Sequence, residues 1–245
     1  MAITVELPSK IPQEDLALLI VQTRRLDIRD VDNGQEPFLY SSGNYGPGYL
    51  DIKGACGIDE VFEPLCQQSA LALMEQDAKF DFIAGNATGG MIPAFRVKQL
   101  LADWTGRRIP YAYLRNTRKL GGHGEYTTGI ANNPYITKES RPLIYEELVN
   151  YAETTGNAAT VWRETEHHEP AMFAGTIVEY ANPEARKRLQ EQSLTLVSVI
   201  DLPTILNIAE DLNLFPRPAI NGFREFLASP FAWMNARGIQ KKELS

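Results

Sequence analysis

Short apolar runs alternate with segments of helical periodicity along most of the chain. Apolar residues that recur every three or four positions predict helices over residues 61–76, 92–104, 183–192 and 202–212. Compact apolar runs predict strands at residues 82–84, 109–114, 143–145, 173–178 and 194–200. This alternation predicts an α/β fold with a mostly parallel, twisted sheet that is covered by helices on both faces. Ligands of such sheets bind at the carboxyl ends of the strands, so the turns after the strands are the places to search for chemistry.

The two ends of the chain depart from this alternation. Residues 12–27 predict a helix, and residues 37–40 and 49–52 predict two short strands around a Gly-Pro turn. Beyond residue 214, aromatic residues such as Phe223, Phe226 and Trp233 supply enough apolar surface for a helical tail. We therefore expect a single domain over residues 1–245, with an N-terminal helix and hood (1–56), an α/β core (57–212) and a helical tail (213–245).

The turn at residues 85–90, Gly-Asn-Ala-Thr-Gly-Gly, leaves a predicted strand and opens a predicted helix. Glycines let backbone N–H groups approach an oxyanion, and a helix N-terminus adds partial positive charge. Thr88 and Gly89 are therefore candidate phosphate-binding residues. The turn fits neither the dinucleotide pattern nor the Walker A pattern, and a tight connection without a ligand is the alternative.

A second candidate turn begins with Glu146 and Glu147, directly after the strand predicted at 143–145. Thr154, Thr155, Gly156 and Asn157 follow and can begin a helix. The carboxylates would accept hydrogen bonds from ribose hydroxyls, and the threonine hydroxyls with successive N–H groups would hold a terminal phosphate. The alternative is an amphipathic helix over residues 145–153 that carries solvated glutamates.

A basic, glycine-rich segment at residues 115–125 contains Arg115, Arg118, Lys119 and His123. Apart from Arg115, it lies within a stretch, residues 116–138, that has no periodicity and is too long for an ordinary connection. Such a loop could close over a diphosphate and neutralise its charge as it leaves. A solvated basic loop with an incidental histidine is the alternative.

Composition narrows the function classes. The formal charge is −7, and 44% of the 245 residues are apolar, which excludes a disordered chain and argues against a surface that binds nucleic acid. Five basic residues without an acid nevertheless lie between Arg107 and Lys119, and this suggests a small anionic ligand. Arg107 and Arg108 precede the strand predicted at residues 109–114 and are expected to be ordinary surface charges.

The chain shows neither a secretory signal pattern nor an apolar run that could span a membrane, so we expect a cytoplasmic protein. Cys56 and Cys66 lack the spacing of a zinc site and are expected to be packing thiols.

Taken together, these segments resemble the type I phosphoribosyltransferases, and among them most closely the orotate phosphoribosyltransferases. Residues 38–43 with Pro47, Tyr49 and Asp51 resemble the base-pocket segment, and residues 81–90 resemble the pyrophosphate loop. Arg115, Lys119, His123 and Gly124 keep the order of the catalytic loop. The two acids and Thr154-Thr155-Gly156 stand in the place of the phosphoribosyl diphosphate motif.

The resemblance implies a reaction of orotate with phosphoribosyl diphosphate that gives orotidine 5′-monophosphate and pyrophosphate in pyrimidine synthesis. It implies catalytic roles for Lys119, Arg115 and His123, and binding of phosphoribosyl diphosphate by the two glutamates, residues 154–157, Thr88 and Gly89. Ser41, Ser42, Gly43 and Tyr49 would bind the base. It also implies Mg²⁺ held mainly by diphosphate and ribose, with Glu146 as a candidate protein ligand, and a homodimer with a shared active site.

Several positions differ from the family pattern. Residues 148–153 lengthen the segment between the acids and Thr-Thr-Gly, and both acids are glutamates. The segment between Lys119 and His123 has two more residues than the family pattern, and Tyr180 stands where many members have an arginine for the orotate carboxylate. These differences leave two alternatives: a non-catalytic homologue that binds a nucleotide or phosphoribosyl diphosphate, or a phosphoribosyltransferase for another base. A DNA-binding regulator is disfavoured, because the residues before Val31 are too few and not basic enough for such a module.

Overall fold

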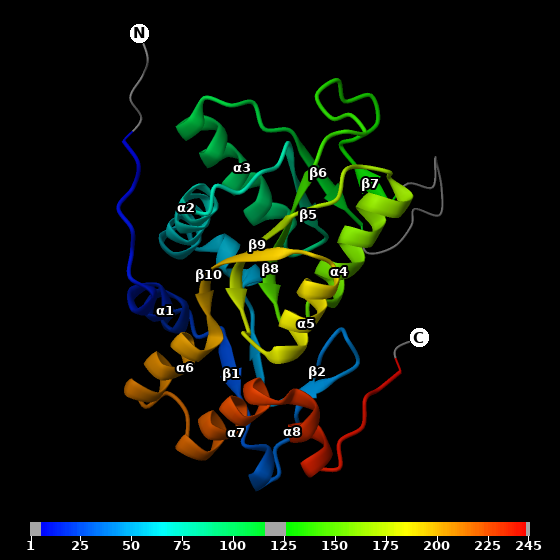
Figure 1. Ribbon diagram of the computed structural model, residues 1–245. Coiled ribbons are helices and arrows are strands. Elements are labelled where there is room, and N and C mark those ends of the chain that lie inside the picture. The colour runs from blue at the N-terminus through cyan, green and yellow to red at the C-terminus, as the bar shows by residue number, and fades with distance from the viewer. Residues whose placement is uncertain (1–5, 116–125, 244–245) are drawn as a thin grey trace.

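A computed structural model describes residues 6–115 and 126–243 of the chain. Its centre is a six-stranded sheet with the order β10-β9-β8-β5-β6-β7 (Figure 1). All neighbours in this sheet are parallel except β6 and β7. The strands are β5 (Phe82–Asn86), β6 (Tyr111–Leu114), β7 (Thr127–Thr128), β8 (Pro142–Val149), β9 (Phe173–Glu179) and β10 (Thr195–Asp201). The predicted α/β class and mostly parallel sheet are confirmed.

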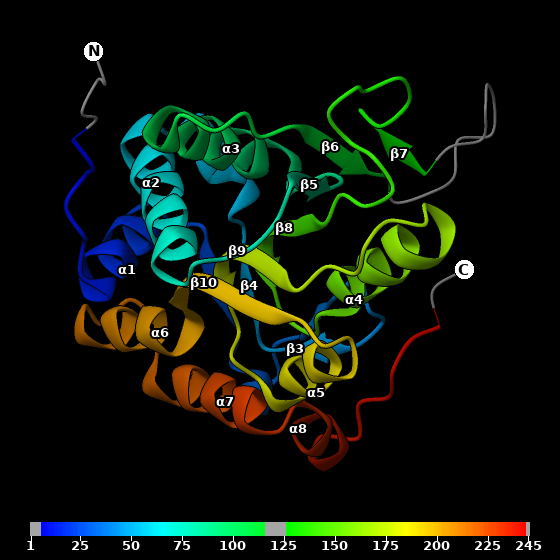
Figure 2. The same ribbon diagram turned by 45° about the horizontal axis from the view of Figure 1, so that its top comes forward.

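Helices cover both faces of this sheet. Helices α2 (Asp59–Glu75) and α3 (Met91–Thr105) pack on one face, and α4 (Glu153–Thr160) and α5 (Pro183–Glu191) pack on the other (Figure 2). A π-helical turn, η3 (Val161–Thr165), extends α4. All five residues of β5 are buried, as expected for a strand with both faces covered.

The N-terminal helix is shorter than predicted. Helix α1 spans Gln13–Gln22 and not residues 12–27, because Arg24 adopts a left-handed φ of 55° and the chain then enters β1 (Leu26–Ile28). Two short 3₁₀ helices, η1 (Val31–Asn33) and η2 (Lys53–Gly57), flank the following segment.

The two short strands predicted around the Gly-Pro turn exist as β2 (Phe38–Leu39) and β4 (Gly48–Leu50), but they do not pair with each other. Instead β2 pairs with a further strand, β3 (Tyr45–Gly46), and β4 pairs with β1, both antiparallel. We call residues 38–52 the hood.

The C-terminal helices pack beside the hood. Helix α6 (Leu202–Asp211) packs on α1, and α7 (Arg217–Ala228) and α8 (Pro230–Ala236) follow it (Figure 1). The buried residues of α7 recur at helical spacing, and Phe223 and Phe226 are fully buried. The aromatic tail therefore forms a helical cap, as its composition predicts.

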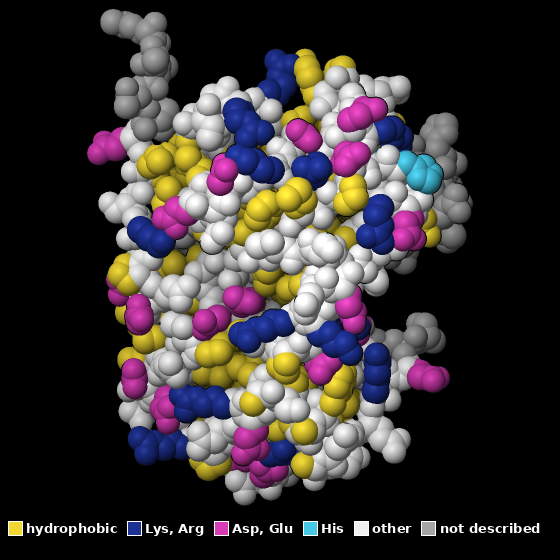
Figure 3. All heavy atoms as spheres, in the orientation of Figure 1, with side chains coloured by type: hydrophobic (Ala, Val, Ile, Leu, Met, Phe, Trp, Pro, Cys, Tyr) yellow, Lys and Arg dark blue, Asp and Glu magenta, His cyan; other side chains and the backbone are white. Residues whose placement is uncertain are grey.

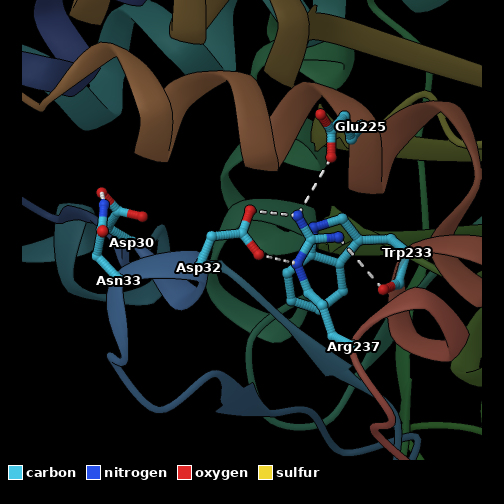
Figure 4. Close-up of polar contacts among 6 residues, drawn as sticks. All are labelled: Asp30, Asp32, Asn33, Glu225, Trp233 and Arg237. Atoms are coloured by element: carbon cyan, nitrogen blue, oxygen red, sulfur yellow. Dashed lines mark hydrogen bonds and ion pairs between the residues drawn. The ribbon is translucent and has the colours of Figure 1, made fainter.

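A charged cluster joins the tail to the segment before the hood. The guanidinium of Arg237 donates to Asp32 in η1 at 2.8 Å and to Glu225 in α7 at 3.2 Å, and it lies over the Trp233 ring (Figure 4). Planar, multidentate pairing of this kind fixes the orientation of both partners.

Within the described residues, no helix combines the length and apolar character that crossing a bilayer demands.

The contact between the hood and α7 generates a stability prediction. A Cβ at Gly48 would collide with the ring of Phe223, so Gly48→Ala should lower the free energy of unfolding by about 1–3 kcal/mol. Phe223→Leu makes room, and the double variant should lose less stability than the sum of the two single losses. Chemical denaturation measures all three.

Gly222→Ala is the matched control, because a Cβ there meets nothing within 4 Å and alanine favours the interior of a helix. It should raise stability by about 0.5–1 kcal/mol. Strictly additive losses for Gly48→Ala and Phe223→Leu would contradict the contact.

Candidate active site

A cleft of about 700 Å³ lies between the hood and the carboxyl ends of β5, β6 and β8. Figure 3 shows the surface hollowed at one edge, between the half with the sheet and the half with the tail. Residues from segments far apart in the sequence line the cleft: Leu39–Ser42, Tyr49–Lys53, Asn86–Gly89, Leu114, Arg115, Tyr126, Glu146–Leu148, Asn150–Thr154, Asn157, Ala158, Val161 and Tyr180. The cleft therefore stands where ligands of parallel sheets bind.

The glycine-rich turn is held close to the acidic strand. Asn86 ends β5, and the N–H of Ala87 donates to the carbonyl of Leu114 at 2.8 Å. A Cβ at Gly89 would collide with the carboxyl group of Glu147, and a Cβ at Gly90 would collide with the carbonyl oxygen of Tyr145. The glycines thus allow β8 to approach the turn, while Thr88 and Gly89 line the cleft.

Both acids belong to a strand that is longer than predicted. Strand β8 runs to Val149, so the alternative of an amphipathic helix over residues 145–153 is wrong. Successive side chains of a strand point to opposite faces, so the two carboxyl groups enter different surroundings.

Glu146 is buried, with 6% of its surface exposed. Its Oε1 accepts hydrogen bonds from Asn86 Nδ2 at 2.7 Å and from Thr155 Oγ1 at 3.4 Å. Burial raises the pKa of this carboxyl group from 4.5 to about 7, although the Asn86 hydrogen bond opposes the shift. Burial thus favours the protonated form of this carboxyl group.

Glu147 lies nearer to solvent and to a cation. Its side chain is 15% exposed, and its Oε1 lies 3.6 Å from Nζ of Lys53. Burial raises the pKa of Glu147, and the charge of Lys53 acts in the opposite sense. Glu147 therefore presents its carboxyl group to the cleft beside Gly89.

The predicted phosphate-binding segment forms the first turn of α4. Ala152 precedes the helix with a left-handed φ of 54°, and Thr154 and Asn157 line the cleft. The first N–H groups of a helix have no intrahelical acceptors, so this end can bind an anion.

Two members of the predicted set lie elsewhere. Thr155 is buried and donates to Glu146, and Gly156 packs against Arg188 while its N–H donates to the carbonyl of Ala152 at 2.9 Å. Neither Thr155 nor Gly156 lines the cleft.

The hood contributes the predicted base-binding residues except one. Ser41, Ser42 and Tyr49 line the cleft. Gly43 does not; its carbonyl accepts a hydrogen bond from the N–H of Lys242 at 2.8 Å, and a side chain there would collide with the tail.

Of the predicted catalytic residues, Arg115 lines the cleft and donates from Nη2 to Thr128 Oγ1 at 2.9 Å. Lys119 and His123 lie outside the described residues. Arg107 and Arg108 are exposed, as expected for surface charges.

Sequence reasoning missed Lys53 and Asn86, which contact the acid pair. Tyr180, which the sequence marks as a difference from the family pattern, is 2% exposed and forms part of the wall. Lys53 follows Tyr49 and Asp51 at alternate positions, which is the signal that could have found it. Nothing in the sequence distinguishes Asn86 from an ordinary turn residue.

The raised pKa of Glu146 predicts a pH-dependent stability effect. The folded chain binds this proton more tightly than the unfolded chain. The stability that the protonated Glu146 side chain contributes is therefore complete below pH 4.5 and is lost as the pH rises through about 7. Glu146→Gln stays neutral and should therefore unfold less readily than the parent at pH 8, by up to about 3 kcal/mol, with the difference shrinking toward pH 4.5. Denaturant titrations at several pH values measure it.

The matched control is Glu191→Gln, at an exposed position, which should change stability by less than about 0.5 kcal/mol. A Glu146→Gln effect that does not vary with pH would contradict the buried environment.

Comparisons with known proteins bear on the resemblance. No family model matches the chain. A curated protein named orotate phosphoribosyltransferase from a Jannaschia species is 27% identical over 244 residues, which cover 95% of this chain and 98% of that protein. The crystal structure of orotate phosphoribosyltransferase from Aeropyrum pernix matches with a TM-score of 0.61 at 20% identity and covers 82% of this chain and 99% of that one.

A further solved structure that shares the fold is a complex with a ligand. Mycobacterium tuberculosis orotate phosphoribosyltransferase in complex with 5-phospho-α-D-ribosyl 1-diphosphate matches with a TM-score of 0.52 at 16% identity, over 80% of this chain and 93% of that one. The resemblance to orotate phosphoribosyltransferases, a group of enzymes, is confirmed, and so is the fold class.

Proposed function

We propose that this chain transfers the phosphoribosyl group of phosphoribosyl diphosphate to orotate, with release of pyrophosphate and with Mg²⁺ as cofactor. The observation that carries the proposal is the meeting of three segments in one cleft: the glycine turn at 86–90, the acid pair on β8 and the first turn of α4. The similarity to orotate phosphoribosyltransferases along nearly the whole chain supports the same reaction.

The diphosphate would bind at the glycine turn. Thr88 and Gly89 line the cleft beside Arg115 and Lys53, which supply positive charge. The terminal phosphate would bind at the N-terminal end of α4, where Thr154 and Asn157 line the cleft. Glu146 and Glu147 lie between these two positions and would accept hydrogen bonds from the ribose hydroxyls.

The reaction needs positioning and charge stabilisation rather than a protein nucleophile. Cleavage of the C–O bond to diphosphate passes through an oxocarbenium-like state, which carboxylates near the ribose stabilise. Arg115, with Lys119 and His123 of the following loop, would stabilise the departing diphosphate. The base would lie under the hood, against Ser41, Ser42 and Tyr49.

The residues fit a magnesium ion that takes most of its ligands from the substrate. Carboxylate oxygens are suitable ligands, and Glu147, which is partly exposed beside Gly89, is placed to hold such an ion, with Glu146 as the second candidate. The described residues contain no cluster of three or more possible metal-binding side chains, so diphosphate and ribose oxygens would complete the set. Mg²⁺ would neutralise charge on the diphosphate.

One observation favours a second candidate, a non-catalytic protein that binds phosphoribosyl diphosphate. The segment from the acids to α4 is long, and the N–H of Gly156 is already bonded within the helix, so fewer donors point at a phosphate. A phosphoribosyltransferase for another base is a third candidate. Position 180 in the cleft wall is a tyrosine, where the resemblance implies an arginine in many members.

An assay separates these candidates. Purified protein with orotate, phosphoribosyl diphosphate and Mg²⁺ should consume orotate, followed by loss of its absorbance. Tight binding of phosphoribosyl diphosphate without turnover of any base would contradict the enzyme proposal and favour the binding protein. Turnover with adenine or hypoxanthine but not with orotate would favour the third candidate.

Lys119→Ala should lower kcat by about two or more orders of magnitude, because it removes a cation from the leaving diphosphate while the fold stays intact. Steady-state kinetics and circular dichroism measure both effects. The matched control is Lys187→Ala, at an exposed position of α5, which should leave kcat unchanged. An unchanged rate for Lys119→Ala would show that the loop residues are wrongly matched.

A homodimer in the cytoplasm, with the loop of one subunit in the site of the other, belongs to the same proposal. Mixing Lys119→Ala with a Glu146→Ala, Glu147→Ala double variant tests the shared site. Hybrids should recover activity at one of their two sites, whereas mixtures that stay inactive would contradict the exchange of loops.

A further inference from the structure

Asn86 stands out among the cleft residues because its side chain contacts an acid and not the solvent. It ends β5, it is 5% exposed, and its Nδ2 donates to Glu146 Oε1 at 2.7 Å. The other residues of β5 are Phe82, Ile83, Ala84 and Gly85, so the amide follows an otherwise apolar strand.

The amide group is only partly satisfied. Within the described part of the chain, Asn86 Oδ1 is buried and has no hydrogen-bond partner. An unpaired buried acceptor costs roughly 1–3 kcal/mol, so an apolar residue of similar size would serve the fold better. The amide is therefore better explained by its bond to Glu146 than by packing.

The bond links three parts of the cleft. Asn86 directly precedes the glycine turn, Glu146 lies on β8, and Thr155, the second donor to the same oxygen, belongs to the first turn of α4. Two donors that converge on Oε1 fix the rotation of the Glu146 carboxyl group, which three side-chain torsions would otherwise leave variable.

We propose that Asn86 is a positioning residue for phosphoribosyl diphosphate: it orients the carboxyl group of Glu146 toward the ribose and couples the ribose site to the diphosphate turn. The inference rests on the proposed function, because it requires that the ribose binds at Glu146. It assigns Asn86 no contact with the reacting atoms.

A double-mutant cycle on ligand binding tests this role. Affinities for phosphoribosyl diphosphate with Mg²⁺ are measured by calorimetry for the parent, Asn86→Ala, Glu146→Ala and the double variant. Asn86→Ala should weaken binding about tenfold or more, since it removes the shorter of the two hydrogen bonds that orient the Glu146 carboxyl group. In the Glu146→Ala background the same change should have no further effect.

Equal losses in both backgrounds would overturn the proposal, because Asn86 would then act through the turn or the fold and not through Glu146. Unchanged binding for Asn86→Ala would overturn it as well. Asn86→Asp keeps the shape of the side chain but removes the donor, so it should weaken binding at least as much as Asn86→Ala. Unchanged binding for Asn86→Asp would also overturn the proposal. This variant serves if Asn86→Ala does not fold.

Ser69→Ala is the control for a structural loss. Ser69 is buried, lies within hydrogen-bond distance of the Tyr145 hydroxyl at 2.6 Å, and does not line the cleft. Its removal should lower stability without changing the affinity.

Kinetics distinguish this inference from the proposed function. If the parent turns over, Asn86→Ala should raise KM for phosphoribosyl diphosphate while leaving KM for orotate within about twofold; an equal rise in both would overturn the positioning role. If the parent binds phosphoribosyl diphosphate without turnover, the transfer reaction fails and the binding cycle still decides the role of Asn86. A parent that does not bind phosphoribosyl diphosphate overturns both.

Discussion

The parallel pairing of β5 with β8 is the constraint on which the cleft depends. Gly85 stands opposite Tyr145 in this pairing, so the residues that follow, Asn86 at the end of β5 and Glu146 within β8, lie side by side. The glycines of the turn then let β8 approach so closely that a Cβ at either Gly89 or Gly90 would collide with it. A shift of register would separate the acids from the turn, because each step along a strand also moves a side chain to the other face. The sheet thus fixes the relative position of two segments that are about 60 residues apart in the sequence.

Much of the fold could be predicted because it depends on local pattern. The apolar runs at residues 82–84 and 173–178 lie inside observed strands, and the aromatic tail forms the helices α7 and α8. The end of β8 could not be predicted in this way, because Glu146 and Glu147 look like solvated residues unless the neighbouring turn and α4 are known to cover them. The pairing of the strands in the hood could not be predicted from the sequence pattern for a similar reason. Strands β2 and β4 are each too short to specify a partner, and long-range contacts with β1 and α7 decide it.

The candidate site shows the same division between residue type and position. Glycine, threonine and paired acids could be recognised as phosphate and ribose chemistry, and Thr88, Gly89, Thr154 and Asn157 do line the cleft. Which threonine faces the ligand could not be read from the sequence, since it follows from where α4 begins. Because Thr154 and Thr155 lie in the first turn of that helix, one reaches the cleft while the other is buried and bonds to Glu146. The proposed role of Asn86 could not be predicted from the sequence, because only the folded sheet brings Glu146 next to it.

Charge finally sets a condition on any anionic ligand of this cleft. Among the described residues, four acids line it, namely Asp51, Glu146, Glu147 and Glu153, against the cations Lys53 and Arg115. Burial raises the pKa of both acids of the pair, and Lys53 already forms an ion pair with Glu147. A diphosphate adds several negative charges at close range, where the low dielectric makes uncompensated repulsion large. Under the proposed function, its binding therefore needs positive charge beyond these two side chains, and the proposed Mg²⁺ together with Arg118 and Lys119 would supply it.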